Sequence, residues 1–158
     1  MTESPASLAQ RLCFALYSAN HAMQAAYKPL LDSVGLTYPQ YLVLTLLWDQ
    51  DDQPMSRIGA ALQLESNTLT PMLKRMETAG LVTRSRDSRD ERQLRLKLTA
   101  AGQALREQTA AFPQCIGEKT RMTAEALSAL RQSVSDLRDT LRDAPRIKSD
   151  IRSDSDQT

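Results

Sequence analysis

Two cysteines are the residues best suited to chemistry in this sequence of 158 residues. Cys13 lies in the run RLCFALYSANH, and the other thiol, Cys115, follows about a hundred residues later. A thiolate is a strong nucleophile, so a cysteine whose anion is stabilised can serve as a redox centre. A cysteine within an apolar helical stripe is most often only a small core residue. The neighbours of Cys13 therefore decide between the two interpretations.

Three tyrosines could stabilise the Cys13 thiolate, because phenolic hydroxyl groups donate hydrogen bonds. Tyr17 lies one helical turn further on, and Tyr38 opens the next predicted helix. Tyr27 follows Cys13 by fourteen residues, which is about 21 Å along an unbroken helix at roughly 1.5 Å per residue. A tyrosine side chain does not span that distance, so Tyr27 can reach the thiol only from a second subunit, in an antiparallel helix pair. The sequence thus predicts a thiol site that exists only in a dimer.

A long helix is predicted to carry Cys13, since apolar residues recur three and four positions apart from Ser7 to Leu31. They form two adjoining stripes, which predicts a wide buried face. Cys13 then lies well past the first turn, where the helix dipole has little effect. Thr37 and Gln40 have the pattern of a capping box, so a second helix through YLVLTLLW begins there. A heptad pattern marks the last predicted helix, at Leu127, Leu130, Val134, Leu137 and Leu141.

Two shorter helices are predicted in the middle of the chain. The second starts at Ser66 and ends at Gly80, a residue suited to the left-handed turn after a helix, with a small distortion at Pro71. The first covers 55–62 and points inward with Ile58, Ala61 and Leu62. The inward residues of the second are Leu69, Met72, Leu73, Met76 and Ala79.

A change of period predicts a β-hairpin after these helices. Leucine alternates with arginine and lysine in LRLKLT, which is the two-residue repeat of a strand. LVTR supplies the partner strand, and the polar run SRDSRDER supplies the loop. Thr99 is expected to cap a further helix that runs to about Lys119 and is disturbed at Pro113 and Gly117.

This order of helix, turn, helix and charged hairpin is that of a winged helix-turn-helix, which places its second helix in the major groove of DNA. The expected fold class is mainly α with a small β-hairpin wing. Between Ser66 and Lys97 there are eight basic and four acidic residues, a net charge of +4 in a chain whose total is +1. A basic module of this kind favours phosphate binding. A solvated surface with no partner is the alternative that charge alone leaves open.

Short polar and basic side chains occupy the predicted solvent side of the second helix. Such groups near a helix N-terminus can approach phosphates and base edges. The residues predicted to contact DNA from this helix are Ser66, Asn67, Thr68, Thr70, Pro71, Lys74 and Arg75, and the hairpin adds Arg84 and Arg86.

The stretch NTLTPMLKRMETAGLVTRSRDSRDERQLRLKLTAAG resembles the DNA-binding core of the MarR family of dimeric winged-helix repressors. The hairpin motif D-x-R of that family is present as Asp90-Glu91-Arg92. The resemblance implies that Asp90 orients the wing and that Arg92 reaches the minor groove. It covers roughly 8–141 and implies an interlocked helical dimerisation region at 7–35 and 100–144, with the winged helix-turn-helix at 37–98.

The stretch LCFALYSANHAMQAAYKPLLDSVGLTYPQYLVL resembles the branch of this family that senses organic hydroperoxides. The resemblance implies that Cys13 is the peroxide-reactive residue and that Tyr27 and Tyr38 of the partner chain hydrogen-bond it. It also implies that Cys115 resolves the oxidised Cys13 as an intersubunit disulfide, which releases operator DNA. His21 departs from the pattern, which has arginine there. The apolar neighbours of Cys13 favour lipid-like or aryl hydroperoxides over hydrogen peroxide.

Two other functions remain open at this stage. One is a regulator of the same family that is gated by a non-covalent phenolic or drug-like ligand, with the cysteines incidental. The other is a thiol peroxidase, but no thioredoxin-like βαβ pattern or peroxidase motif surrounds Cys13. We therefore expect a repressor rather than an enzyme.

Composition narrows the remaining possibilities. No run of about 18 apolar residues exists, so no membrane span is expected. The start MTESPASLAQ lacks the pattern of a signal peptide, which favours a cytoplasmic protein with reduced thiols. Two cysteines and one histidine so far apart make a poor metal site, and no cofactor is expected. The polar segment 145–158 is predicted to be a disordered tail.

Overall fold

The computed structural model describes residues 7–90 and 92–144, and the tail predicted at 145–158 lies outside them. The described chain is mostly helical with one small antiparallel sheet, as the sequence predicted. It divides into two compact units, 1–116 and 117–158, which are described separately. None of the described helices is both long and apolar enough to cross a membrane.

The first helical segment differs from the single helix expected over 7–31. A short 3-10 helix, η1 (Leu8–Gln10), is followed by α1 (Leu12–Asp32), because the backbone of Arg11 is extended between them. Cys13 is thus the second residue of α1, so the expectation that it lies well past the first turn is wrong. The predicted wide buried face is exposed in the single chain, where Leu31 is the one buried residue of α1.

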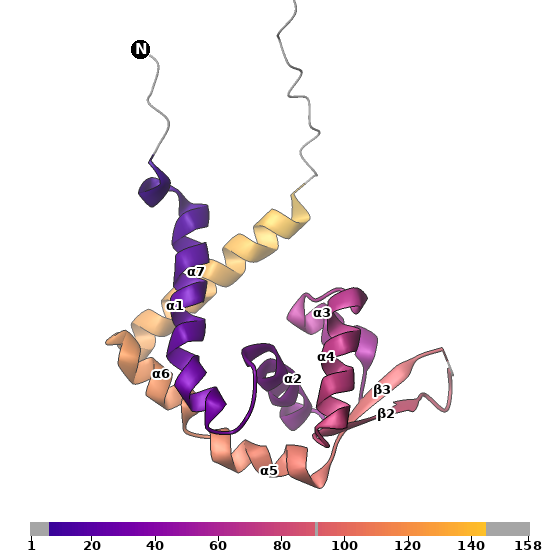
Figure 1. The fold of residues 1–158 in the computed structure, drawn as a ribbon. Helices are drawn as coiled ribbons and strands as arrows, with labels where there is room; N and C mark the ends of the chain where they lie inside the picture. Colours follow the sequence, from indigo (N-terminus) through magenta and orange to yellow (C-terminus); the bar gives the residue numbers. More distant parts are fainter. Residues whose placement is uncertain (1–6, 91, 145–158) are drawn as a thin grey trace, which may run out of the picture. The chain divides into compact units, whose positions relative to one another are not determined.

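The winged module begins with α2 (Tyr38–Asp49), and its start is the predicted capping box: Thr37 accepts from the Gln40 amide, and the Gln40 side chain accepts from the Thr37 amide at 2.9 Å. The short helix α3 (Met55–Leu62) and α4 (Ser66–Thr78) follow. The turn between them passes through Gln63, whose φ of +57° is left-handed. These elements form the helix-turn-helix that the sequence predicted (Figure 1).

The wing is a sheet of three strands in the order β1-β3-β2. The predicted hairpin is present as β2 (Val82–Arg86) and β3 (Leu94–Leu98), with Val82 opposite Leu98 and Arg86 opposite Leu94. A third strand, β1 (Gln53–Pro54), was not predicted and pairs with the other side of β3. Figure 1 shows the β2–β3 hairpin extending away from the helices of the module.

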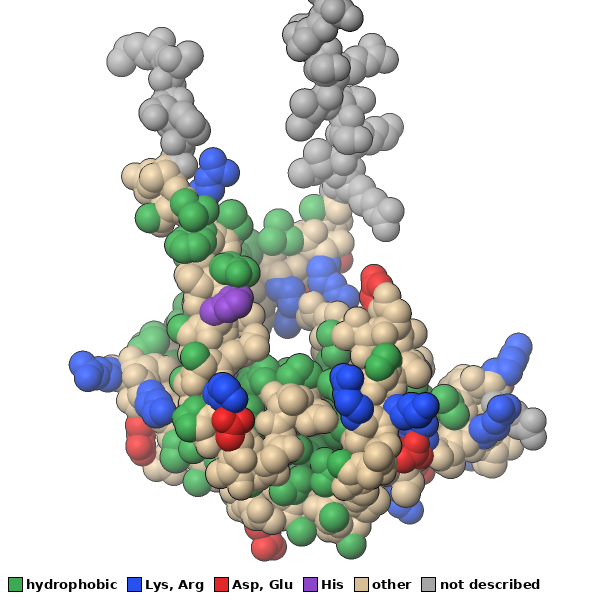
Figure 2. All heavy atoms as spheres, in the orientation of Figure 1, with side chains coloured by type: hydrophobic (Ala, Val, Ile, Leu, Met, Phe, Trp, Pro, Cys, Tyr) green, Lys and Arg blue, Asp and Glu red, His purple; other side chains and the backbone are tan. Residues whose placement is uncertain are grey.

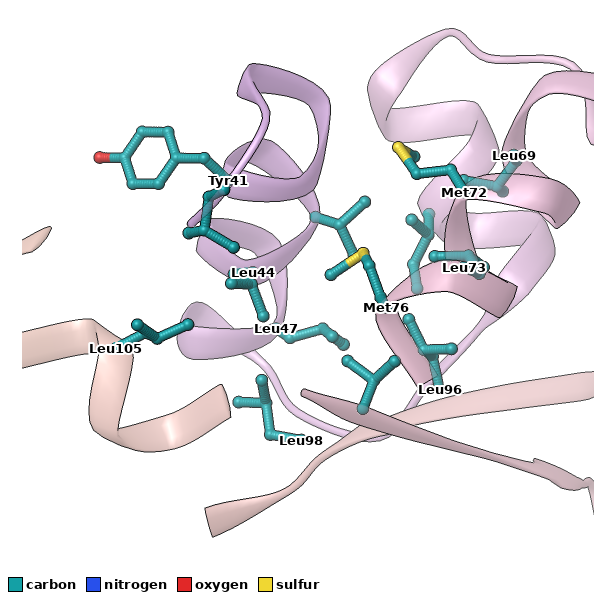
Figure 3. Close-up of a cluster of buried hydrophobic side chains, with 14 of the residues drawn as sticks. Tyr41, Leu44, Leu47, Leu69, Met72, Leu73, Met76, Leu96, Leu98 and Leu105 are labelled. Carbon is teal, nitrogen blue, oxygen red and sulfur yellow. The ribbon is translucent and has the colours of Figure 1, made fainter. Parts of the chain in front are cut away.

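The core of this module lies between α2, α4 and the sheet (Figure 3). The predicted inward residues of α4 from Leu69 to Met76 are buried, but Ala79 is exposed because it caps the end of the helix. In α3, Ile58 is buried while Ala61 is exposed. Gly59 takes the inward position instead, and its α-carbon faces the Leu64 carbonyl closely enough that an added β-carbon would lie 3.1 Å from that oxygen.

The segment after the wing forms two helices rather than the one expected, α5 (Ala100–Thr109) and α6 (Phe112–Thr120). Thr99 caps α5 as predicted, accepting from the Gly102 amide at 3.0 Å. Pro113 does not disturb the interior of a helix, because it is the second residue of α6, where its missing amide leaves no bond unmade. In the second unit, α7 (Ala124–Asp143) carries the predicted apolar stripe, with Leu130, Val134 and Leu141 exposed.

Candidate functional site

The exposed face of α4 and the hairpin loop form a basic and polar surface, and Figure 2 shows Lys and Arg side chains on this side of the molecule. The amphipathic sequence of α4 buries its apolar stripe in the core and thereby turns its polar residues to solvent. All seven residues predicted to contact DNA from this helix are exposed: Ser66, Asn67, Thr68, Thr70, Pro71, Lys74 and Arg75.

The hairpin loop is held by the aspartate of the D-x-R motif. The Asp90 carboxylate accepts from the backbone amide and the Nε of Arg92, each at 3.1 Å, and from the Gln93 side chain at 3.4 Å. These bonds, first among them the one from the Arg92 side chain, lower the pKa of Asp90. The Arg92 side chain remains 91% exposed. The loop is therefore ordered locally while one cation points to solvent.

Arg84 has a different environment from the one predicted for it. Its guanidinium lies 2.6 Å from the Glu77 carboxylate, its side chain is only 21% exposed, and its backbone amide donates to the same carboxylate at 3.2 Å. The Arg84 side chain thus joins β2 to α4. Arg86, one pleat further along β2, is exposed.

A second set of ion pairs that supports the wing was not predicted from the sequence. Arg95 on β3 makes ion pairs with Asp52 before β1 and with Asp87 at the start of the hairpin loop. Its two partners lie 43 and 8 residues away. The sequence shows an arginine in the alternating strand and the acidic run DQDD, but neither feature identifies which acidic residues pair with Arg95.

Cys13 is an exposed free thiol in the first turn of α1. Tyr17 is 61% exposed, and its ring lies 4.4 Å from the ring of His21, centroid to centroid. Tyr27 is on the same helix, fourteen residues after Cys13, so within one chain the two are separated by the distance that the sequence implied.

Tyr27 and Tyr38 are brought together at the other end of α1. Their ring centroids are 5.2 Å apart, and Tyr27 is 5.8 Å from Tyr41. Burial, followed by the neighbouring Tyr41 and Tyr38, raises the pKa of Tyr27 to about 12. Both hydroxyl groups therefore stay protonated at neutral pH and can donate hydrogen bonds. Tyr38 also borders a hollow of about 290 Å³ between α1 and the start of α2.

Cys115 lies on α6 as a partly buried free thiol. Its neighbours Phe112 and Ile116 are buried, so α6 is anchored on both sides of the thiol. Among the described residues, no group of three or more His, Cys, Asp or Glu side chains is arranged to hold a metal ion.

A family model for SarA/Rot transcriptional regulators matches 25–108 of this chain. The transcriptional regulator TtmR of Methylorubrum extorquens is 45% identical over 139 residues, which cover 88% of this chain and 71% of TtmR. The organic hydroperoxide resistance transcriptional regulator of Bacillus subtilis is 43% identical over 134 residues, which cover 85% of this chain and 91% of that protein.

Solved structures of AbfR, a protein of Staphylococcus epidermidis, are also similar. Reduced AbfR bound to DNA is 39% identical, with a TM-score of 0.70 over 85% of this chain and 92% of AbfR. AbfR with a disulfide is 40% identical, with a TM-score of 0.61 over 82% of this chain and 91% of AbfR. The likeness extends over the winged module and beyond it.

Proposed function

Since the chain belongs to the MarR and SarA/Rot family of winged-helix transcriptional regulators, we propose that its reduced form represses transcription from operator DNA and that an organic hydroperoxide releases the DNA by oxidising Cys13. The chain is a DNA-binding transcriptional regulator, as its relatives are. One of those relatives is named for organic hydroperoxide resistance, and AbfR has been solved both reduced on DNA and with a disulfide. A thiol switch is therefore the first hypothesis for the two cysteines.

The observation that carries this proposal is the placement of the reactive groups at opposite ends of α1. Cys13 is exposed at the N-terminal end, and Tyr27 pairs with Tyr38 near the C-terminal end. If two α1 helices pack antiparallel, the thiol end of one meets the tyrosine end of the other. The exposed Leu12 and Tyr17, 59% and 61% accessible, supply apolar surface for that pairing.

The proposed reaction has two steps. The Cys13 thiolate attacks the terminal oxygen of the hydroperoxide: an S–O bond forms, the O–O bond breaks, and the alkoxide takes a proton and leaves as an alcohol. Sulfur is oxidised by two electrons to a sulfenic acid, and the peroxide is reduced. The Cys115 thiol of the other chain then condenses with the sulfenic acid, forming a disulfide and releasing water.

The disulfide would change how the two winged modules meet DNA. The α5 helix packs with the winged module, because the Trp48 indole donates to the Gly102 carbonyl at 3.0 Å and Leu105 is in the core. Cys115 is the fourth residue of α6, which begins at Phe112 after the break at 110–111. A bond formed at Cys115 would therefore pull on the module through a short connection. Losing several phosphate contacts in this way lowers affinity by orders of magnitude.

The test is non-reducing gel electrophoresis and DNA release before and after cumene hydroperoxide. The DNA is a duplex selected from random sequences by the reduced wild-type protein. We expect a new dimer band and loss of DNA binding in the wild type, with the band absent from both Cys13→Ser and Cys115→Ser. Release of DNA by Cys13→Ser at the wild-type peroxide concentration would reject the proposal and favour a regulator gated by a non-covalent ligand.

A peroxide-consumption assay separates the sensor from a thiol peroxidase. A sensor consumes about one equivalent of hydroperoxide per Cys13, whereas a peroxidase turns over when a recycling thiol is present. Dithiothreitol also reduces the disulfide of a sensor, so the proposed role is contradicted only by turnover at an enzyme-like rate, on the order of one per second or faster per Cys13.

A further inference from the structure

The wing has two kinds of arginine, and their surroundings separate them. Arg92 is 91% exposed at the loop. Arg95 is 28% exposed and lies on the central strand of the sheet, opposite Ser85 of β2 and Pro54 of β1. Since the function proposed above uses Arg92 as a DNA contact, the question is what Arg95 does beside it.

All three nitrogens of the Arg95 guanidinium donate hydrogen bonds to two aspartates. Nε donates to Asp52 Oδ1 at 2.8 Å, Nη1 donates to Asp87 Oδ2 at 2.9 Å, and Nη2 donates to the Asp52 backbone carbonyl. A guanidinium presents its donors in a rigid planar fork, so bonds from all three nitrogens to two residues fix its orientation. Two carboxylates around one guanidinium leave this cluster with a net charge of −1, which repels a phosphate.

Each aspartate ties Arg95 to a different segment. Asp52 lies in the connection between α2 and β1, where its φ of +53° makes a tight turn. Asp87 opens the hairpin loop: its amide donates to the Gln93 carbonyl at 2.8 Å, and its other carboxylate oxygen accepts from the Arg89 amide at 2.8 Å. Arg95 therefore connects the loop of the wing to the end of α2.

The shape of the wing makes such a connection consequential. The β2–β3 hairpin extends away from the helices (Figure 1), so the contacts at its base bear on where its loop lies. At about 3.3 Å per residue, Arg92 is on the order of 10 Å beyond Arg95. A tilt of the hairpin by roughly 15° would then move Arg92 by about 3 Å, which is the length of a hydrogen bond.

We propose that Arg95 is a positioning residue: together with Asp52 and Asp87 it sets the angle of the wing at which Arg92 meets DNA, and it does not bind DNA itself. This proposal rests on the DNA-contacting role proposed for Arg92. Hydrogen bonds between the three side chains, rather than the positive charge of Arg95, are what the wing requires.

The sign of the effect of an aspartate variant tests this directly. If Arg95 bound phosphate, Asp87→Asn would remove a competing negative charge and strengthen DNA binding. If Arg95 positions the wing, Asp87→Asn weakens binding by reduced protein to a selected duplex of about 30 base pairs, long enough for two half-sites one helical turn apart. We expect a loss of roughly tenfold, and the same direction for Asp52→Asn.

Asp49→Asn is the matched control, because it removes an exposed acid at the end of α2 that has no ion pair among those found in the described residues. It should leave affinity unchanged or raise it slightly. Arg95→Lys keeps the charge but cannot make the three bonds, so it should bind DNA more weakly than wild type. Circular dichroism and the fluorescence of the single tryptophan, Trp48, establish that each variant is folded at the assay temperature.

A double-mutant cycle gives a readout that a merely destabilised protein would not produce. If Asp87→Asn misplaces Arg92, then Arg92→Ala has little further effect in that background. Additive losses, or tighter binding by Asp87→Asn, overturn the proposal. If Arg92→Ala alone leaves DNA affinity unchanged, the wing does not contact DNA through Arg92, and this proposal fails with that role. If Arg92→Ala lowers DNA affinity but Asp87→Asn does not, only the positioning role of Arg95 is rejected. All of these assays use reduced protein without peroxide, so they are independent of the redox switch.

Discussion

The rings of Tyr27 and Tyr38 lie 5.2 Å apart, although one belongs to the end of α1 and the other opens α2. The tight turn through Gly35, whose φ is +69°, allows this approach. The pair therefore presents two hydroxyl groups from two helices at one place. In the proposed dimer, that place receives the thiol of the other chain.

Removing either hydroxyl should slow the oxidation of Cys13. A hydrogen bond to a charged group contributes about 1.5–3 kcal/mol, so Tyr27→Phe and Tyr38→Phe should each lower the rate of sulfenic acid formation by roughly tenfold or more. The measurement is trapping of the sulfenic acid with a dimedone probe and mass spectrometry after cumene hydroperoxide.

Tyr41→Phe is the control for this pair, because Tyr41 belongs to the same ring cluster but is 7% exposed and packs against Trp48 and Phe112. It removes the same atom without removing a proposed thiolate donor. Equal rates for all three variants would show that the tyrosines of this cluster serve only packing.

Alkaline pH should destabilise the fold through the same tyrosine cluster. The pKa of Tyr27 is about 12 in the folded protein, against its ordinary value of 10.0 in the unfolded chain. The stability linked to the protonated Tyr27 hydroxyl is therefore fully present below pH 10. Between those values the unfolded chain binds fewer protons than the folded one, and stability falls as pH rises toward 12. Urea unfolding across this range should show the fall, and Tyr27→Phe should make it shallower; an unchanged slope in the variant would contradict the assignment.

The ion pair between Arg84 and Glu77 should matter for stability more than for DNA contact. The bond from the Arg84 side chain, first among several causes, lowers the pKa of Glu77 below its usual 4.5. The stability that the ionised Glu77 contributes is therefore present above pH 4.5 and is lost as pH falls through the lower pKa of the folded protein. Glu77→Gln should lower the melting temperature at pH 7 and flatten the acid side of the stability profile.

Salt dependence of DNA binding distinguishes Arg84 from a true phosphate contact. Each phosphate contact contributes about 0.9 to the slope of log affinity against log salt concentration. Lys74→Met on the exposed face of α4 should reduce that slope by about one unit if Lys74 contacts phosphate. Arg84→Met, measured where the variant is folded, should reduce it by much less. Equal reductions would place Arg84 among the DNA contacts, as the sequence alone suggested.

Features encoded by neighbouring residues could be predicted, and features made by distant residues could not. The start of α2 follows from Thr37 and Gln40, which bond each other across one turn. Strand β1 is two residues long and exists only because Gln53 and Pro54 meet β3 some forty residues later. Its residues carry no local strand signal, since proline is disfavoured in sheets.

The same limit applies to the candidate site. The exposed face of α4 and the D-x-R motif could be predicted, because their roles depend on helical periodicity and on a local loop. The count of charges included both Arg84 and Arg95, and Arg84 was predicted to contact DNA. The count could not show that acidic side chains engage both arginines, because those contacts are fixed by tertiary structure. The break at 110–111 lies just before Pro113, where a disturbance was expected. Pro113 has no amide to donate to the Thr109 carbonyl, so α5 ends at Thr109 and α6 begins at Phe112.

Two glycine-to-alanine variants should have opposite effects on stability, and together they test how α5 joins the winged module. A β-carbon on Gly102 would lie 2.1 Å from the Leu81 carbonyl oxygen, a backbone atom that cannot move aside. Gly102→Ala should therefore cost about 1–3 kcal/mol, the range for overpacking, and should weaken the Trp48 bond to the Gly102 carbonyl. Gly117 in α6 is the matched control, since an added β-carbon meets its nearest neighbour at 4.0 Å. Gly117→Ala should stabilise α6 by up to about 1 kcal/mol through helix propensity.

Urea unfolding followed by Trp48 fluorescence measures the stability of both glycine variants. If Gly102→Ala were as stable as wild type, α5 would not be locked to the module, and a pull on Cys115 could not reach the DNA-binding surface by this route.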